Sequence, residues 1–232
     1  MDYAIIAAGE GSRLVREGVT WPKPLVRLNG TPLLDRLIDI FLQNEATSIS
    51  VIVNEEMKEV QAYLGKLQLP VPFRLLIKST PSSMHSFFEL KEYLVNERFC
   101  LTTVDTIFKK EEFKHYIQSF LTSEDMDGLM AVTDYIDDEK PLYVNTGRDM
   151  LIKSFSDEAQ PDSRYISGGI YCLKRSALEV LDNAIAKGMY RMRNYQRLLI
   201  EEGLTLKAYP FGKIVDIDHA GDIVKAEQFL NT

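Results

Sequence analysis

The segment AAGEGSRLVREGVTWPKPLVRLNG, residues 7–30, combines flexible backbone with positive charge directly after the apolar run YAIIAA. Gly9 and Gly11 allow backbone amides to approach a ligand closely, and successive amides that point into a concavity bind anions. Arg13 offers a planar fork that suits phosphate oxygens, whereas Lys23, held between two prolines, offers a compact charge. The segment therefore predicts a binding site for a phosphate-bearing ligand.

The charge balance sets this segment apart from the rest of the chain. The 232 residues include 27 basic and 34 acidic side chains, a formal net charge of −7, whereas residues 11–30 hold four basic residues against Glu17 alone. Two common phosphate-binding templates do not match. A dinucleotide-binding loop needs a third glycine where Leu14 stands, and the Gly-Lys-Ser/Thr of a Walker loop does not occur.

Three aspartates far from this segment lie at the ends of apolar runs that are typical of strands. Asp105 follows RFCLTTV, and Asp216 and Asp218 close the run KIVDID. An aspartate in such a place is costly unless it is paired or liganded, and Mg²⁺ usually takes one or two carboxylates together with substrate phosphates. We therefore expect Asp105 to be a metal ligand. Asp218 stands directly before the last helix, so a ligand and a helix cap are both open for it.

The elements that must position these residues alternate along the first half of the chain. This alternation predicts a parallel sheet with helices on both faces. We expect strands at residues 2–8, 49–54, 73–78 and 98–104, and helices at 32–46, 55–67 and 83–96. Because ligands collect at the carboxyl ends of such strands, the glycine-rich segment, Asp105 and the pair Asp216 and Asp218 should converge in space.

The second half of the chain has a different pattern. Short strand-like runs predict an antiparallel extension beside the parallel sheet, followed by helices at 176–188 and 193–203, two more strands and a last helix at 220–230. The expected strands of the extension are residues 127–136, 141–146, 149–155 and 165–173. No repeat or low-complexity linker occurs, so we expect one α/β domain over residues 1–232.

Composition narrows the class of protein. The chain is 45% apolar and 26% charged, as in an ordinary globular domain, and its acidic balance argues against nucleic acid as a partner. No run approaches the ~20 apolar residues of a membrane span, and the start MDYAIIAAGE lacks the basic part of a secretory signal. We therefore expect a cytoplasmic protein without a membrane partner. Cys100 and Cys172 lie in apolar runs and should be buried free thiols.

The string AAGEGSRL, followed nine residues later by KPL, resembles the signature of the nucleotidyltransferase family that joins an NTP to a phosphorylated sugar or alcohol. This family includes sugar-1-phosphate nucleotidylyltransferases, bacterial phosphocholine cytidylyltransferases and MobA-like enzymes. The resemblance continues through TTVDTIF, ISGGIYCLKRSALEVL and VDIDHAGDIVKAEQFL, and so covers nearly the whole chain. It implies a Rossmann-like fold of the nucleotide-diphospho-sugar transferase type, with a nucleotide-binding half at 1–125 and an acceptor-binding half at 126–232.

The resemblance also implies roles for individual residues. Arg13 would grip the β- and γ-phosphates and Lys23 the α-phosphate, while Mg²⁺ would bind Asp105 and Asp216, with Asp218 nearby. Ser82 and Ser83 could face the nucleobase or cap a helix. The expected contacts of the nucleotide with the glycine-rich segment are Ala7, Ala8, Gly9, Glu10, Gly11 and Ser12.

The acceptor side departs from the family pattern. Many members carry a Glu-Lys-Pro whose lysine meets the acceptor phosphate, but the corresponding stretch here is SFSDEAQPDS. Lys153, Arg191 or Arg193 could replace that lysine, and we expect Gly169 to contact the acceptor with Lys153 and Arg193.

The expected reaction transfers NMP to a phosphorylated acceptor, a sugar phosphate in the first instance, and releases pyrophosphate. A phosphocholine-type cytidylyltransferase, a glycosyltransferase of similar fold and a non-catalytic nucleotide-binding subunit are the alternatives. A glycosyltransferase usually has Asp-x-Asp where Asp105, Thr106 and Ile107 stand. The sequence leaves the nucleobase and a homo-oligomer open.

Overall fold

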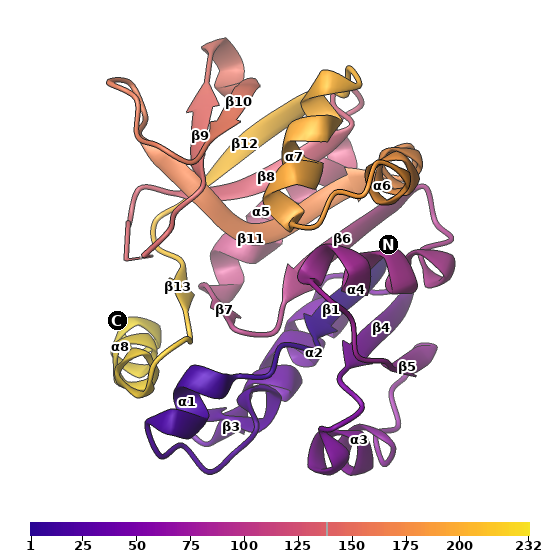
Figure 1. Ribbon diagram of the computed structural model, residues 1–232, viewed down its shortest axis with the longest axis vertical. Coiled ribbons are helices and arrows are strands. Elements are labelled where there is room, and N and C mark those ends of the chain that lie inside the picture. Colours follow the sequence, from indigo (N-terminus) through magenta and orange to yellow (C-terminus); the bar gives the residue numbers. More distant parts are fainter. Residues whose placement is uncertain (138) are drawn as a thin grey trace.

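The computed structural model describes residues 1–137 and 139–232. A nine-stranded sheet runs through the molecule, and its parallel part has the strand order β5-β4-β1-β6 (Figure 1). These parallel strands are β1 (Asp2–Ala7), β4 (Ser48–Val53), β5 (Phe73–Ile77) and β6 (Arg98–Thr103). The loops at their carboxyl ends therefore open toward one edge, as the alternating pattern predicts.

An antiparallel extension continues the sheet beyond β6. The long strand β11 pairs antiparallel with β6, β8 and β9, while β12 lies parallel to β8 and β10 closes the far edge against β9. The bounds are β8 (Gly128–Thr133), β9 (Tyr143–Thr146), β10 (Ile152–Ser156), β11 (Tyr165–Lys174) and β12 (Leu206–Phe211). The predicted mixed α/β architecture is thus confirmed.

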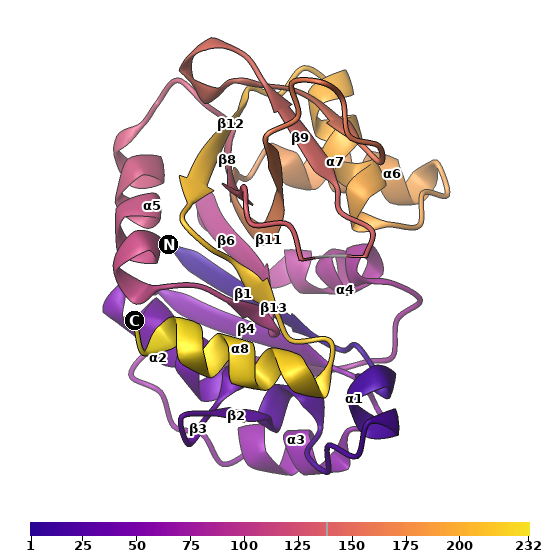
Figure 2. The ribbon, with the colours of Figure 1, turned by 90° about the vertical axis from the view of Figure 1, so that its left-hand side faces the viewer.

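Helices cover both faces of the sheet (Figure 2). Alternate side chains of β1 point to opposite sides: Tyr3 and Ile5 join one core with α2, α3, α5 and α8, and Ala4 and Ile6 join the other with α4, α6 and α7. The helices are α2 (Leu33–Gln43), α3 (Lys58–Leu64), α4 (Ser83–Leu90), α5 (Lys110–Thr122), α6 (Ala177–Ala186), α7 (Met192–Glu201) and α8 (Ala220–Leu230). Among these described helices none is long and apolar enough to cross a bilayer.

The structure differs from the predicted helix and strand boundaries mainly where it forms short elements. The run KIVDID forms only the two-residue strand β13 (Val215–Asp216), which pairs with β7 (Thr106–Ile107) outside the main sheet. The helix predicted at 83–96 is shorter than expected: α4 ends at Leu90 and is followed by a 3₁₀ turn, η2 (Lys91–Tyr93). The remaining short elements are α1 (Ser12–Arg16), η1 (Lys23–Leu25), β2 (Arg27–Leu28), β3 (Thr31–Pro32) and η3 (Arg148–Met150).

A buried tyrosine connects α5 to the junction of the two parts of the sheet. The Tyr116 hydroxyl donates to the carbonyl of Leu129 at 2.5 Å and accepts the backbone N–H of Cys172 at 2.9 Å. Cys172 lies opposite Cys100 across β11 and β6, and both are buried free thiols, as predicted. Burial raises the pKa of the Cys100 thiol well above its ordinary value, which keeps it protonated.

Replacing Tyr116 by phenylalanine should lower the free energy of unfolding by about 1–3 kcal/mol, because the N–H of Cys172 loses its buried acceptor. Urea denaturation measures this change. Tyr190→Phe is the control, since Tyr190 is 52% exposed and water can replace its hydroxyl; we expect a change within about 0.5 kcal/mol. Equal losses for the two variants would contradict the structural role assigned to Tyr116.

Candidate active site

The glycine-rich segment leads from the end of β1 into the short helix α1. Gly11 is the N-cap of α1 and has a φ of 60°, in the left-handed region that favours glycine. A Cβ atom at Gly11 would lie 3.1 Å from the Cβ atom of Lys23. Glycine at this position therefore lets η1 pack directly against the loop, and η1 carries Lys23.

Lys23 joins two aspartates that come from distant parts of the chain. Its Nζ lies 2.5 Å from Oδ2 of Asp105 and 2.8 Å from Oδ1 of Asp218, and its side chain is only 10% exposed. Burial opposes the charge, but these two carboxylates outweigh it and raise the pKa of Lys23, so the ammonium group persists at neutral pH. Arg13 adds a third link, with Nη1 3.1 Å from Oδ2 of Asp218. We call Arg13, Lys23, Asp105 and Asp218 the ion-pair cluster.

Asp218, rather than Asp216, completes this cluster. Asp216 lies in β13, where it pairs with Thr106 of β7. The expected alternative of a helix cap at Asp218 is wrong, because His219 is the N-cap residue of α8. Asp222 completes the capping box: its Oδ2 accepts the backbone N–H groups of Asp218 at 3.2 Å and His219 at 2.8 Å. The side chain of Asp218 is thereby left to face Lys23 and Arg13.

The cluster brings two carboxylates close to one another. Within residues 1–137 and 139–232, no group of three or more His, Cys, Asp or Glu side chains is arranged to hold a metal ion. Two carboxylates, those of Asp105 and Asp218, do converge on the single cation of Lys23. Mg²⁺ commonly takes one or two carboxylates and completes its shell with water and substrate phosphates, so this donor set suits it when a nucleotide is bound.

A pocket of about 450 Å³ opens beside the cluster. Ala8, Gly9, Glu10 and Gly11 line it together with Lys23, Asp105 and several hydroxyl side chains. Two described residues that were expected to contact the nucleotide, Ala7 and Ser12, do not line this pocket. The side chain of Ala7 is buried in the core, and Ser12 is exposed at the start of α1, outside this lining. We call this hollow the loop pocket.

Ser82 and Ser83 line the loop pocket at the start of α4. Ser82 is the N-cap residue, yet its Oγ contacts Nδ1 of His85 at 2.9 Å and makes no capping hydrogen bond to the helix backbone. Thr80 and Ser86 face each other with their hydroxyl oxygens 2.6 Å apart. The serines are therefore arranged as a polar wall of the pocket rather than as helix caps.

The sequence analysis missed several polar residues of the loop pocket, among them Asn54, Ser79 and Thr103. Asn54 follows β4 and Thr103 ends β6, so each stands at the carboxyl end of a parallel strand. Ligands bind at the carboxyl ends of parallel strands, so this position in the sequence could have identified both residues as candidates for the site. Oδ1 of Asn54 accepts a hydrogen bond from Ser79 at 3.2 Å, which links the walls contributed by β4 and β5.

Glu17 ties the glycine-rich segment to the C-terminal helix. Its carboxylate contacts Nδ1 of His219 at 2.6 Å and accepts the backbone N–H of Ala220 at 2.7 Å. The hydrogen bond with Glu17 raises the pKa of His219, and the same contact lowers the pKa of Glu17. These bonds hold Asp218 close to Arg13 although the two are 205 positions apart in the chain.

Gly169 allows β11 to approach the turn that carries Asp105. Its φ is 72°, and a Cβ atom there would lie 3.0 Å from Oγ1 of Thr106. Thr106 in turn contacts the hydroxyl of Thr103 at 2.7 Å. The structure therefore gives Gly169 a steric reason to be glycine beside the cluster.

We expect Gly169→Ala to lower the free energy of unfolding by about 2–3 kcal/mol, since it combines backbone strain with displacement of Thr106. Gly188→Ala is a matched control. Gly188 has a φ of 68° but nothing within 4 Å of an added Cβ, so we expect about 1 kcal/mol from backbone strain alone. Thermal and urea unfolding of the two variants measure the difference, and equal losses would show that the contact with Thr106 is unimportant.

The basic residues expected at the acceptor lie away from the cluster. Lys153 is exposed on the edge strand β10, where its aliphatic stem packs over Gly147. Arg193 forms an ion pair with Asp157 and donates to the carbonyl of Lys140 at 3.0 Å. Among the described residues, neither lines the loop pocket or the hollow on the other side of the cluster. The partners of Arg193 hold its side chain away from both hollows.

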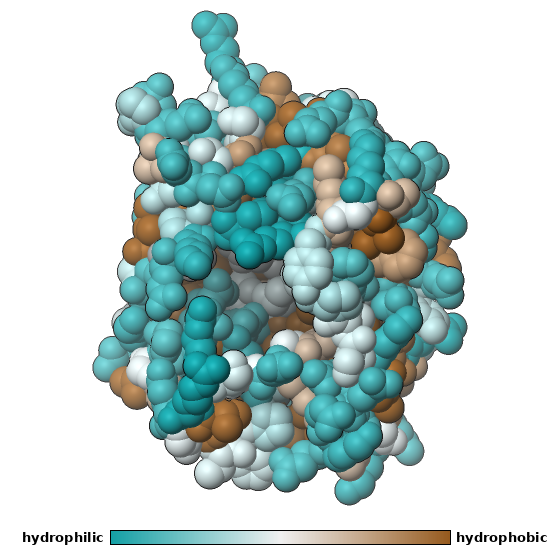
Figure 3. Space-filling model, viewed as in Figure 1, coloured by the Kyte–Doolittle hydropathy of each residue, from teal (hydrophilic) through white to brown (hydrophobic). Residues whose placement is uncertain are grey.

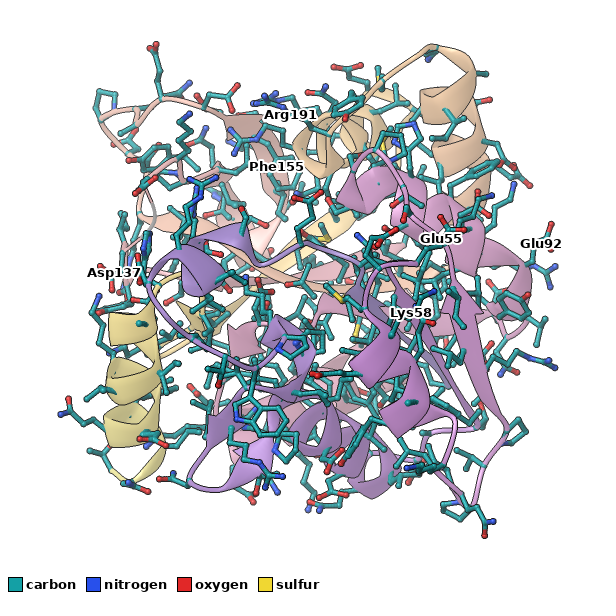
Figure 4. All side chains as sticks on the ribbon, turned by 60° about the horizontal axis from the view of Figure 1, so that its bottom comes forward. Glu55, Lys58, Glu92, Asp137, Phe155 and Arg191 are labelled. Atoms are coloured by element: carbon teal, nitrogen blue, oxygen red, sulfur yellow. The ribbon has the colours of Figure 1, made fainter. Side chains whose placement is uncertain are left out.

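That second hollow, of about 250 Å³, is lined mostly by polar residues. Arg13, Asp216 and Asp218 line it together with residues of β11, the segment after β8 and the start of α8. Asp137 of this lining lies beside α8 (Figure 4), where Lys225 contacts it at 2.9 Å. Figure 3 shows a hollow in the face seen in Figure 1, bordered mainly by hydrophilic side chains. We call the 250 Å³ hollow the acidic pocket.

The chain is similar to known proteins along nearly its whole length. The chain is 26% identical to the bifunctional protein GlmU of Thermodesulfovibrio yellowstonii over 246 residues, which cover 99% of this chain and 52% of that protein. The chain thus spans about half the length of this relative. A 60-residue stretch, 26% of this chain and 24% of the relative, is 40% identical to the 2-aminoethylphosphonate cytidylyltransferase of Lancefieldella rimae.

The fold is that of solved nucleotidyltransferases. A Bacillus anthracis protein described as a glucose-1-phosphate thymidylyltransferase superposes with a TM-score of 0.85 at 20% identity, over 99% of this chain and 94% of that one. Residues 3–195 match the model of the MobA-like NTP transferase domain. This match covers most of the chain and confirms the family resemblance. The chain therefore belongs to the MobA-like NTP transferase domain family.

Proposed function

We propose that the protein transfers NMP from an NTP to a phosphorylated small-molecule acceptor and releases pyrophosphate. An acceptor oxygen attacks the α-phosphorus, and the bond from that phosphorus to the oxygen bridging to the β-phosphate breaks. Such acceptor oxygens are ionised near neutral pH, so the reaction needs positioning and charge neutralisation rather than a general base. The observation that carries the proposal is the convergence of Lys23, Asp105 and Asp218 between the loop pocket and the acidic pocket.

In this proposal the nucleotide occupies the loop pocket. The backbone of the glycine-rich segment holds the phosphates, and Ser82 and Ser83 face the base. Lys23 neutralises the α-phosphoryl oxygens and Arg13 the departing pyrophosphate. Mg²⁺, held by Asp105 and Asp218 with Asp216 nearby, would supply further neutralisation of phosphate charge. Gly169 stands beside the acceptor and keeps β11 close to the turn of Asp105.

The acceptor is a small phosphorylated compound that enters from the acidic pocket. A sugar phosphate is the first candidate, because a structural neighbour that covers 99% of this chain is described as a glucose-1-phosphate thymidylyltransferase. The second candidate is an alcohol phosphate or phosphonate of the phosphocholine type, which the local 40% identity to an aminoethylphosphonate enzyme favours. A phosphate acceptor gives a nucleoside diphosphate derivative, and a phosphonate acceptor gives a mixed anhydride of the NMP and the phosphonate.

A screen tests the proposed function. Each of the four common NTPs is incubated with Mg²⁺ and with each acceptor from a panel of sugar phosphates, phosphocholine and aminoethylphosphonate, and pyrophosphate is measured. We expect release only when an NTP and an acceptor are both present. Nucleotide binding without pyrophosphate release from any pair would instead indicate a non-catalytic nucleotide-binding subunit.

A further inference from the structure

The charges of the ion-pair cluster balance one another. Arg13 and Lys23 supply two positive charges and Asp105 and Asp218 two negative ones, so the formal charge of the cluster is zero. Nζ of Lys23 contacts Oδ2 of Asp105 and Oδ1 of Asp218, and Arg13 contacts the remaining oxygen of Asp218. A divalent cation that binds these oxygens must therefore compete with cations of the protein itself.

This competition is strongest at Lys23. Its side chain is 10% exposed, whereas that of Arg13 is 50% exposed, and buried charges are screened less by water and salt than exposed ones. Nζ lies 2.5 Å from Asp105 and 2.8 Å from Asp218. Any second cation that shares both of these oxygens lies directly beside an ammonium group of like charge, so it binds well only when Lys23 moves away.

Lys23 has a second place where its charge can be satisfied. It lines the loop pocket together with Gly9 and Gly11, whose backbone would hold the phosphates of the nucleotide. The flexible four-carbon stem of a lysine lets the ammonium group move while Pro22 and Pro24 restrain the backbone on either side. A triphosphate in the loop pocket also offsets the charge of a divalent cation, which on its own would make the cluster strongly positive.

We infer that Lys23 occupies the cation's place at Asp105 and Asp218 until a nucleotide enters, so that the divalent cation and the NTP bind together. This inference rests on the proposed function, which puts the phosphates in the loop pocket. The α-phosphate then draws Lys23 from the carboxylates, and the carboxylates become available to the cation. Contact with the carboxylates and neutralisation of the α-phosphoryl oxygens are thus successive positions of one side chain.

Equilibrium binding of Mn²⁺ tests this exchange without any turnover, because carboxylates that suit Mg²⁺ also bind Mn²⁺. Without nucleotide, we expect Lys23→Met to bind Mn²⁺ at least about tenfold more tightly than the unmodified protein, a coupling of ordinary size between two ligands. The gain should disappear in Lys23→Met/Asp105→Asn. A lysine with a merely structural role would give no gain of metal affinity when it is removed.

A second measurement uses an α,β-methylene analogue of each NTP, which cannot be cleaved at the α-phosphorus. Mn²⁺ should tighten the binding of the best analogue to the unmodified protein at least about tenfold, and should do so less in Lys23→Met. This comparison also decides the matter if Lys23→Met does not fold, because equal Kd values for the analogue with and without Mn²⁺ in the unmodified protein would overturn the inference.

The control variant is Lys78→Met. Lys78 pairs with Glu89 at 2.8 Å on the surface, with 55% of its side chain exposed, and its removal should leave the affinity for Mn²⁺ unchanged. Equal affinity of the unmodified protein and folded Lys23→Met for Mn²⁺ would overturn the exchange and leave the proposed function standing. A gain of affinity in Lys23→Met without pyrophosphate release from any NTP and acceptor would support the exchange and overturn the proposed function.

Discussion

Replacing Lys23 by alanine is expected to lower kcat about 100- to 1000-fold, the loss typical for removal of one preorganised group that stabilises transition-state charge. Lys23 is buried against Asp105 and Asp218. Among the described side chains it alone forms ion pairs with both of these carboxylates, so no neighbouring cation can replace it in the variant. Steady-state pyrophosphate release with saturating NTP and acceptor measures the effect. Loss of the positive charge between two carboxylates also lowers the stability of the fold. Thermal unfolding of the variant is therefore measured as well, to show that the protein assayed is folded.

The matched control for this variant is Lys78→Ala. Lys78 also pairs with a carboxylate, that of Glu89 at 2.8 Å, but its side chain is 55% exposed and lies outside the ion-pair cluster. We expect kcat within about twofold of the unmodified protein, as is usual for a surface substitution. A folded Lys23→Ala protein with undiminished kcat would refute the role assigned to Lys23.

Conversion of Asp105 or Asp218 to asparagine should lower kcat/KM at least about 100-fold, since each change removes a charge needed for the cation and phosphate network. The same substitution at Asp216 should cost less than about tenfold, because Asp218 rather than Asp216 contacts Lys23. Mg²⁺ titrations of pyrophosphate release should show a higher requirement for Mg²⁺ in the first two variants. Asp182→Asn, at an exposed ion pair with Lys91, is the control.

The double variant Asp105→Asn/Asp218→Asn adds a further test of this pair. If the two carboxylates act on the same cation, their losses should not add, and the double variant should be little worse than the more damaged single one. Additive losses would indicate two independent sites. A larger loss for Asp216 than for Asp218 would contradict the arrangement of the cluster.

The fold could be predicted where the hydrophobic period was long and regular. In α2, the predicted stripe includes Leu33, Leu37 and Phe41, and all three are at most 1% exposed. The run KIVDID has the same local pattern as a core strand, but only Val215 and Asp216 pair, and with β7 instead of the main sheet. Which partner a short strand finds depends on tertiary contacts that local periodicity does not contain.

The site could be predicted in part, for a related reason. Gly11, Lys23 and Asp105 stand in short motifs or directly at the end of a strand, and the structure brings them together. Asn54 follows a strand but belongs to no recognisable motif, and the sequence does not show which of Asp216 and Asp218 faces Lys23. Such contacts become visible only when the chain is folded.

Isotope tracing tests the central chemistry most directly. The protein is incubated with Mg²⁺, an acceptor and NTP labelled either at the α-phosphate or at the γ-phosphate. We expect the α-label to appear in a nucleoside diphosphate derivative of the acceptor and the γ-label in pyrophosphate, with neither product formed when the acceptor is omitted. Transfer of the γ-label to the acceptor, or release of labelled inorganic phosphate without an acceptor, would contradict nucleotidyl transfer at the cluster of Lys23, Asp105 and Asp218.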